Sequence, residues 1–183
     1  FGGSTGTEQL LDIHDLNYFY LDLLDELGLD NLPIVGHSLG GMFAAELAAM
    51  QPARFSHVAL AAPFGLWNDS DPIPDLFSIS LPELATAMYA DVKSEPAAAL
   101  ATAPQARMTE VDPSTEEGQA TLNFLVERAK SMSTAAKYLW PIPNRGLSKR
   151  LHRVTQPAQI IWGQSDGIVP PGYAERFAAK MPN

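Results

Sequence analysis

The sequence predicts an α/β fold, in which helices flank a parallel sheet and a helical segment is inserted between two of the strands. Three apolar runs, at residues 32–35, 57–62 and 159–162, predict buried strands because they are short and lie next to glycine or proline. A helical pattern separates the first two runs. This strand–helix–strand order implies parallel strands joined by right-handed crossovers.

Helices are expected before, between and after these strands. Residues 8–27 carry leucine, isoleucine and tyrosine at helical spacing, and Gly28 suits the position just past a helix end. A second helix begins near Leu39 and ends before Pro52, which cannot continue it. A last helix covers residues 173–180.

The middle of the sequence has a different pattern. Residues 67–82 contain three prolines among polar residues and predict a loop, and helical stretches follow at 82–89, 96–107 and 115–139. No strand pattern occurs there. We therefore predict that residues 63–150 form a helical cap inserted into a core made of residues 1–62 and 151–183.

Composition excludes several functional classes. The formal net charge is −9 and the isoelectric point is about 4.8, whereas nucleic acids and anionic membranes attract basic proteins. The sequence has no cysteine, which excludes disulfides and thiolate metal sites. No apolar run approaches the roughly 18 residues of a membrane span. We expect no cofactor, no metal, no nucleic-acid partner, no membrane span and a cytoplasmic location; the oligomeric state is left open.

The segment with the clearest chemistry is Gly36-His37-Ser38-Leu39-Gly40-Gly41, a Gly-x-Ser-x-Gly pattern between a predicted strand and a predicted helix. A serine on so sharp a turn needs small neighbours, which Gly36 and Gly40 provide, and makes a candidate nucleophile. The N–H of Leu39, at the helix start, is a candidate oxyanion donor. The alternative is a phosphate-binding turn, but no Gly-x-Gly-x-x-Gly or Walker pattern is present and the loop has no lysine or arginine.

Asp166 is the candidate acid. It follows the last predicted strand, at the edge of the sheet where an open α/β fold gathers its functional groups. There it can orient an imidazole and stabilise its cationic form. The alternative is an aspartate that caps the turn before the last helix. Asp69 and Asp71, beyond the second strand, are less favoured candidates.

On these two motifs the sequence resembles the α/β-hydrolase superfamily, and looks most like its cap-bearing esterases and C–C-bond hydrolases. The resemblance covers nearly the whole chain: residues 36–41 look like the nucleophile elbow, 63–150 like the cap, 162–170 like the acid loop, and 1–4 like the glycine-rich segment after the family's fourth strand. It implies an order Ser…Asp…His, with Ser38 and Asp166 as the first two members of a catalytic triad. It also implies that His37 points away from the nucleophile.

Two parts of the family pattern have no counterpart in the sequence. These are the His-Gly type oxyanion loop, which precedes the elbow, and the catalytic histidine, which follows the acid loop. His14, His57 and His152 are expected to be surface or core residues, and His152 is the least unsuitable substitute. We therefore expect a piece of a longer enzyme that is inactive alone, and one unpaired side on the strand at 32–35.

The expected reaction is hydrolysis of a small hydrophobic carboxylic ester through an acyl-enzyme on Ser38. C–C-bond hydrolysis of a dienoic diketo compound is an alternative within the same family, and a non-catalytic small-molecule-binding protein is an alternative of another class. A serine nucleophile speaks against epoxide hydrolase and haloalkane dehalogenase chemistry, which the family performs with an aspartate. The expected apolar lining of the substrate pocket is Trp67, Leu76, Phe77, Leu81, Met88, Tyr89, Met132 and Trp140.

Overall fold

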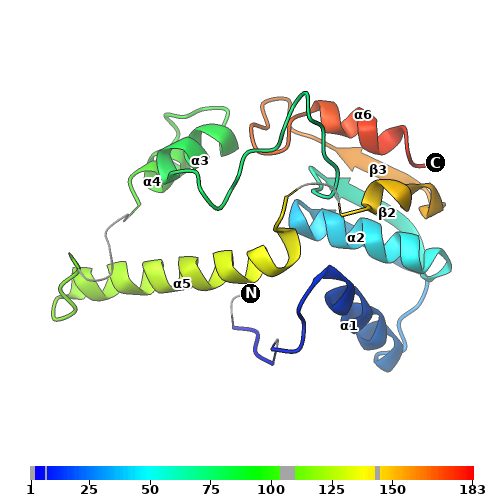
Figure 1. The fold of residues 1–183 in the computed structure, drawn as a ribbon, viewed down its shortest axis with the longest axis horizontal. Coiled ribbons are helices and arrows are strands. Elements are labelled where there is room, and N and C mark those ends of the chain that lie inside the picture. Colours follow the sequence, from blue (N-terminus) through cyan, green and yellow to red (C-terminus); the bar gives the residue numbers. More distant parts are fainter. Residues whose placement is uncertain (1–2, 7, 104–109, 143–144) are drawn as a thin grey trace.

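A computed structural model describes residues 3–6, 8–103, 110–142 and 145–183 of the 183-residue chain. Figure 1 shows the sheet with α1, α2 and α6 gathered at one end of the molecule and α3, α4 and α5 extending away from it. The elements are α1 (Ile13–Glu26), β1 (Leu32–His37), α2 (Leu39–Met50), η1 (Pro52–Arg54), β2 (Phe55–Ala61), α3 (Leu81–Met88), α4 (Glu95–Ala101), α5 (Glu116–Leu139), η3 (Leu147–Lys149), η4 (Leu151–Arg153), β3 (Ala158–Ile161) and α6 (Gly172–Ala178).

The sheet has three strands in the order β1-β2-β3, and both neighbouring pairs are parallel. This confirms the predicted α/β class and its parallel strands. Within the described residues β1 pairs with β2 alone. The strand at 32–35 therefore has one unpaired side, as expected.

The predicted helices occur, with shifted ends. The first begins at Ile13 and not at residue 8, because Asp12 caps it by accepting hydrogen bonds from the backbone N–H groups of His14 and Asp15. Gly28 follows its end with φ +61°, the left-handed geometry that glycine tolerates best. The stretch predicted at 96–107 is helical from Glu95 to Ala101, and residues 104–109 lie outside the described part of the chain.

The core lies between α2 and the sheet. Nine of the twelve residues of α2 are buried, and the inward side chains of β2 close the other side, with Val58 2% and Leu60 0% exposed. An ion pair fastens the segment before β3 to α2: Arg150 donates through Nε and a terminal nitrogen to the two carboxylate oxygens of Glu46, at 2.7 and 2.5 Å. This packing fixes the relative positions of all three strand ends.

Candidate active site

The three strands end at the same edge of the sheet. The register pairs His37 with Ala61 and Ala61 with Ile161, which are the last residues of β1, β2 and β3. Ser38 follows β1 directly and Asp166 lies in the loop after β3. Parallel strands are spaced about 4.8 Å apart, so the ends of β1 and β3 are roughly 10 Å from each other. Side chains from the two loops can therefore reach a common space.

Ser38 occupies a sharp turn between β1 and α2. Its φ is 55° and its ψ is −121°, a conformation that non-glycine residues rarely adopt and that costs on the order of 1–3 kcal/mol. Neighbouring strands hold the turn: the Ser38 N–H donates to the Ala61 carbonyl at 2.9 Å, and the Ser38 carbonyl accepts from the Phe64 N–H at 3.1 Å. Sheet pairing thus stabilises a backbone that would otherwise relax.

Two glycines make room for this turn. A Cβ at Gly36 would lie 2.3 Å from the Gly40 carbonyl oxygen, and one at Gly41 would lie 2.8 Å from Cβ of Pro63. The expectation that Gly40 is needed for its small size is wrong, because a Cβ there would meet no described atom within 4 Å beyond its own helix turn. The second close contact belongs to Gly41, because the chain leaving β2 passes against it.

The backbone N–H of Leu39 is available to a ligand. Leu39 is the first residue of α2, where helix N–H groups have no acceptor within the helix. Among the described residues we find no hydrogen bond from this N–H to any other group. The start of α2 therefore presents a free donor and the positive end of the helix dipole beside Ser38.

A cavity of about 590 Å³ lies over this sheet edge. Ser38, Asp166 and His37 form part of its wall, and Leu76, Leu84 and Met88 form an apolar part. The remaining lining residues are Ala62, Ala90, Gly163, Gln164, Ser165, Ile168 and Val169. The structure thus brings Ser38 and Asp166 together in one cavity, which we call the Ser38 cavity. His37 also lines this cavity, although the resemblance implied that its side chain points away from the nucleophile.

Asp166 is held by its own loop, residues 162–170, which we call the acid loop. Its Oδ1 accepts hydrogen bonds from the N–H groups of Ile168 and Val169, both at 2.9 Å. The indole N–H of Trp162 donates to the Val169 carbonyl at 2.8 Å and closes the loop. Asp166 therefore caps this turn, which was the alternative to a catalytic role that the sequence left open. Its Oδ2 has no partner among the described residues and can still accept a further hydrogen bond.

The less favoured acids do not line the Ser38 cavity. Asp69 accepts a hydrogen bond from the Trp67 indole at 2.8 Å, and both Asp69 and Asp71 are exposed. The phenol of Tyr173 accepts from the Asn68 N–H and donates to the Asp71 carbonyl, each at 2.9 Å. Burial raises the pKa of Tyr173, which keeps this donor protonated at neutral pH. These contacts hold the loop after β2 and leave its aspartates away from Ser38.

The four histidines are all exposed. His14, His57 and His152 do not contribute to the Ser38 cavity, and among the described residues Ser38 Oγ has no hydrogen-bond partner. His152, the least unsuitable substitute for a general base, lies in η4, before β3 and away from this edge. No histidine of the described chain therefore joins Ser38 to Asp166.

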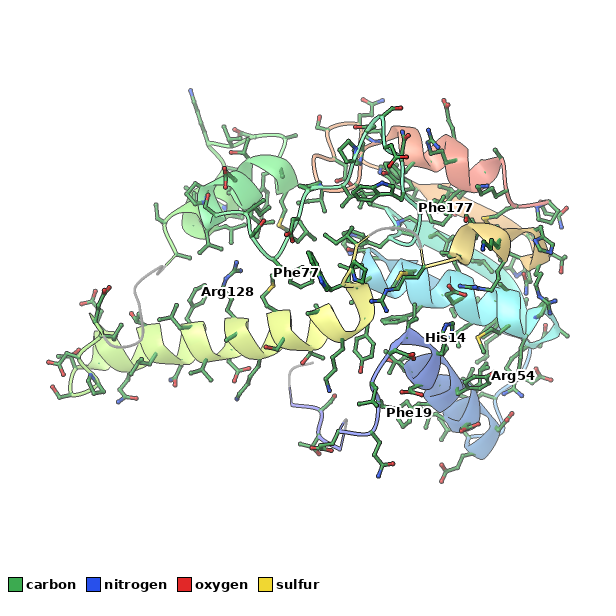
Figure 2. All side chains as sticks on the ribbon, viewed as in Figure 1. His14, Phe19, Arg54, Phe77, Arg128 and Phe177 are labelled. Carbon is green, nitrogen blue, oxygen red and sulfur yellow. The ribbon has the colours of Figure 1, made fainter. Side chains whose placement is uncertain are left out.

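A second cavity, of about 730 Å³, lies between α5 and the segment before α3. Figure 2 shows Phe77 and Arg128 facing this space from its two sides. Of the residues expected to line the substrate pocket, Leu76 and Met88 line the Ser38 cavity and Phe77, Met132 and Trp140 line the second one. Leu81 is a core residue, and Trp67 and Tyr89 line neither cavity. Leu84 and the loop residues Gln164 and Ser165 were missed, because no periodic pattern distinguishes them.

The described residues offer neither a metal site nor a membrane-spanning helix. No group of three or more histidine, aspartate or glutamate side chains is arranged to hold a metal ion. None of the described helices combines the length and the apolar character needed to cross a bilayer.

Curated proteins similar to this chain include hydrolases of ring-cleavage products. The chain is 30% identical over 170 residues to a 2-hydroxy-6-oxononadienedioate/2-hydroxy-6-oxononatrienedioate hydrolase of Dechloromonas aromatica, a match that covers 88% of this chain and 55% of that protein. It is 25% identical over 163 residues to a 2-hydroxy-6-oxo-6-phenylhexa-2,4-dienoate hydrolase of Burkholderia cepacia, with 88% and 55% covered. The chain thus spans about half the length of these relatives.

Solved structures share the fold. A bromoperoxidase from Bacillus anthracis superposes with a TM-score of 0.64 at 19% identity, over 100% of this chain and 67% of that one. A meta-cleavage product hydrolase from Pseudomonas fluorescens IP01 superposes with a TM-score of 0.64 at 17% identity, over 99% and 64%. The family model described as the alpha/beta hydrolase fold matches residues 1–183, and the chain belongs to that family.

Proposed function

We propose that this chain supplies the nucleophile and the acid of a serine hydrolase, with Ser38 as nucleophile and Asp166 as the residue that orients a histidine from outside these 183 residues. The observation that carries the proposal is the pairing of a strained Ser38 with Asp166 in one cavity, at the edge where all three strands end. The free N–H of Leu39 adds an oxyanion donor at the same place.

The chemistry follows from these positions. Ser38 Oγ attacks the substrate carbonyl carbon while the histidine takes the hydroxyl proton, and the Leu39 N–H stabilises the oxyanion. The histidine returns the proton to the leaving alcohol, which departs and leaves an acyl group on Ser38. Water, deprotonated by the same histidine, then releases the acid. Asp166 Oδ2 holds the imidazole and stabilises its cationic form, while Oδ1 remains in the acid loop.

The proposed substrate is a small, hydrophobic carboxylic ester. Leu76, Leu84 and Met88 present apolar surface to the Ser38 cavity, and its volume of about 590 Å³ suits a small molecule. The polar groups gather beside Ser38, where the carbonyl would bind. An apolar acyl or aryl group would lie against α3.

C–C-bond hydrolysis of a dienoic diketo compound is the second candidate. It is favoured by the relatives from Dechloromonas aromatica and Burkholderia cepacia, whose names state that they hydrolyse 2-hydroxy-6-oxo unsaturated acids. The same serine, oxyanion donor and acid would serve both reactions, so the substrate decides between them.

The test uses the longest natural protein that contains these residues. We expect a fluorophosphonate probe to label it on Ser38, and we expect hydrolysis of 4-nitrophenyl butyrate that Ser38→Ala lowers by at least about 10³-fold. Asp166→Asn should lower it by about 10³–10⁴-fold. Parallel assays on 2-hydroxy-6-oxo-6-phenylhexa-2,4-dienoate decide between ester and C–C-bond hydrolysis by comparing kcat/KM.

Ser131→Ala is the matched control, because Ser131 is exposed on α5 and lines neither cavity. It should retain labelling and turnover. Labelling that survives Ser38→Ala would contradict the proposal. A protein that binds both substrates but neither reacts with the probe nor turns them over would instead be the non-catalytic binding member of the fold. The 183-residue chain by itself should show little turnover.

A further inference from the structure

Helix α3 is fastened to the acid loop at one point. The N–H of Gly167 donates a hydrogen bond of 3.0 Å to the carbonyl of Ala87, in the last turn of α3. Carbonyls at a helix end have no partner inside the helix, so this bond satisfies one of them. Figure 1 shows the loop before α6 reaching the end of α3.

This contact has no substitute nearby. Among the described residues it is the only hydrogen bond that joins α3 or α4 to the strands, to α6 or to the loops between them. The position of α3 over the sheet edge therefore depends on this bond and on the packing of two buried side chains, Leu81 and Ala85.

The contact is also tight, so that a side chain at Gly167 requires its neighbour to shift. A Cβ at Gly167 would lie 3.0 Å from both Cα and the carbonyl oxygen of Ala87, and these are backbone atoms that cannot turn aside. Gly167 does not have a positive φ, so a side chain at this position is opposed by the neighbouring helix and not by its own backbone. Any side chain at 167 must push α3 away from the acid loop.

The two elements that meet at Gly167 both line the Ser38 cavity. Leu84 and Met88 come from α3, and Asp166 and Ile168 flank Gly167 in the acid loop. We propose that Gly167 is a positioning residue that sets the width of the Ser38 cavity by letting α3 rest directly on the acid loop, and so determines which acyl groups fit beside Ser38. The specificity part of this inference rests on the proposed function.

The first test does not require activity. Hydrogen exchange should be measured on peptides covering residues 81–90 in the wild-type protein, Gly167→Ala, Gly167→Val and Gly172→Ala. We expect exchange in this segment to be faster in Gly167→Ala than in the wild-type protein, and faster again in Gly167→Val. The increase for the valine variant should be about tenfold or more. Gly172→Ala is the control, because a Cβ at the start of α6 would meet no described atom within 4 Å.

The second test measures acyl preference. The ratio of kcat/KM for 4-nitrophenyl octanoate to that for the butyrate ester should rise in Gly167→Ala and by about tenfold in Gly167→Val, because a wider cavity accepts the longer chain. A role limited to folding would lower both constants together and leave the ratio unchanged. If valine prevents folding, the alanine variant still decides the question, since its Cβ requires only a small shift of α3.

The outcomes separate this inference from the proposed function. Faster exchange at residues 81–90 without Ser38-dependent turnover would support the contact and contradict the proposed function. Unchanged exchange in both Gly167 variants would overturn the inference whatever the activity. Altered exchange with an unaltered acyl ratio in an active enzyme would overturn the role of Gly167 in specificity.

Discussion

Helices α2 and α5 are held in place by different forces. Nine of the twelve residues of α2 are buried, whereas only Gly118, Tyr138 and Leu139 are buried among the 24 residues of α5. The start of α2 has no side-chain cap, and its N-cap residue Ser38 is strained. The start of α5 is capped by Thr115, whose side chain accepts from the Gly118 N–H, and two glutamates follow.

The comparison shows which helix depends on its surroundings. Burial stabilises α2 strongly enough to tolerate an unfavourable start, and the strain falls on the residue with the clearest chemistry. Helix α5 depends on local signals along most of its length and on tertiary contacts near its ends. Substitutions of buried residues should therefore lower the free energy of unfolding more in α2, and loss of an N-cap should lower it more in α5.

The largest difference is expected for the ion pairs of the two helices. Arg150→Met leaves Glu46, 2% exposed, as a buried carboxylate without its partner, and should lower the free energy of unfolding by about 3–5 kcal/mol. Lys130→Met breaks the exposed pair between Lys130 and Glu127 on α5 and should cost less than about 0.5 kcal/mol. Urea unfolding of both variants measures the difference. Equal effects would mean that α2 is not the better-anchored helix.

Substitutions of the two N-cap residues should change the free energy of unfolding by a smaller amount, and with opposite sign in the two helices. Ser38→Gly should stabilise the protein by about 1 kcal/mol, because glycine adopts a positive φ without strain, while it abolishes labelling by a fluorophosphonate. Thr115→Ala should destabilise it by about 1 kcal/mol through loss of the cap. Thermal unfolding, with Ser38→Ala as the reference that lacks the hydroxyl but keeps the strain, separates these effects. Destabilisation by Ser38→Gly would show that the turn is not strained.

The smallest effect concerns the docking of α5 at alkaline pH. Tyr138, near the end of α5, packs edge-on against Phe43 of α2, and burial, with the charges of Tyr20 and Asp15, raises its pKa above the ordinary value of 10.0. Because its pKa is raised in the folded state, the protonated Tyr138 contributes its full stabilisation below pH 10. This contribution is lost as the pH rises through the pKa of the folded state. Tyr138→Phe should therefore reduce the loss of stability above about pH 10. An unchanged pH profile would place the alkaline sensitivity elsewhere, for example at Tyr173.

Much of this arrangement could be predicted from local patterns. The three strands, the turn at Ser38 and the helix after it follow from apolar runs and glycines within a few residues of one another. The ends of the helices were less accurate where a cap decided them, as at Asp12, whose side chain starts α1 five residues later than the apolar pattern suggested. The need for a small residue was correctly assigned to Gly36 but wrongly to Gly40, because the crowding at Gly41 comes from Pro63, in the segment that follows β2.

The sequence by itself determined the class of fold and the chain order of Ser38 and Asp166, because each is a property of neighbouring residues or of order along the chain. Only the tertiary structure decided that Ser38 and Asp166 line one cavity and that Gly167 meets the end of α3. The physical reason is that Ser38 and Asp166 lie 128 positions apart along the chain (166 − 38) and Ala87 and Gly167 lie 80 apart (167 − 87), so strand register and helix packing set their distances.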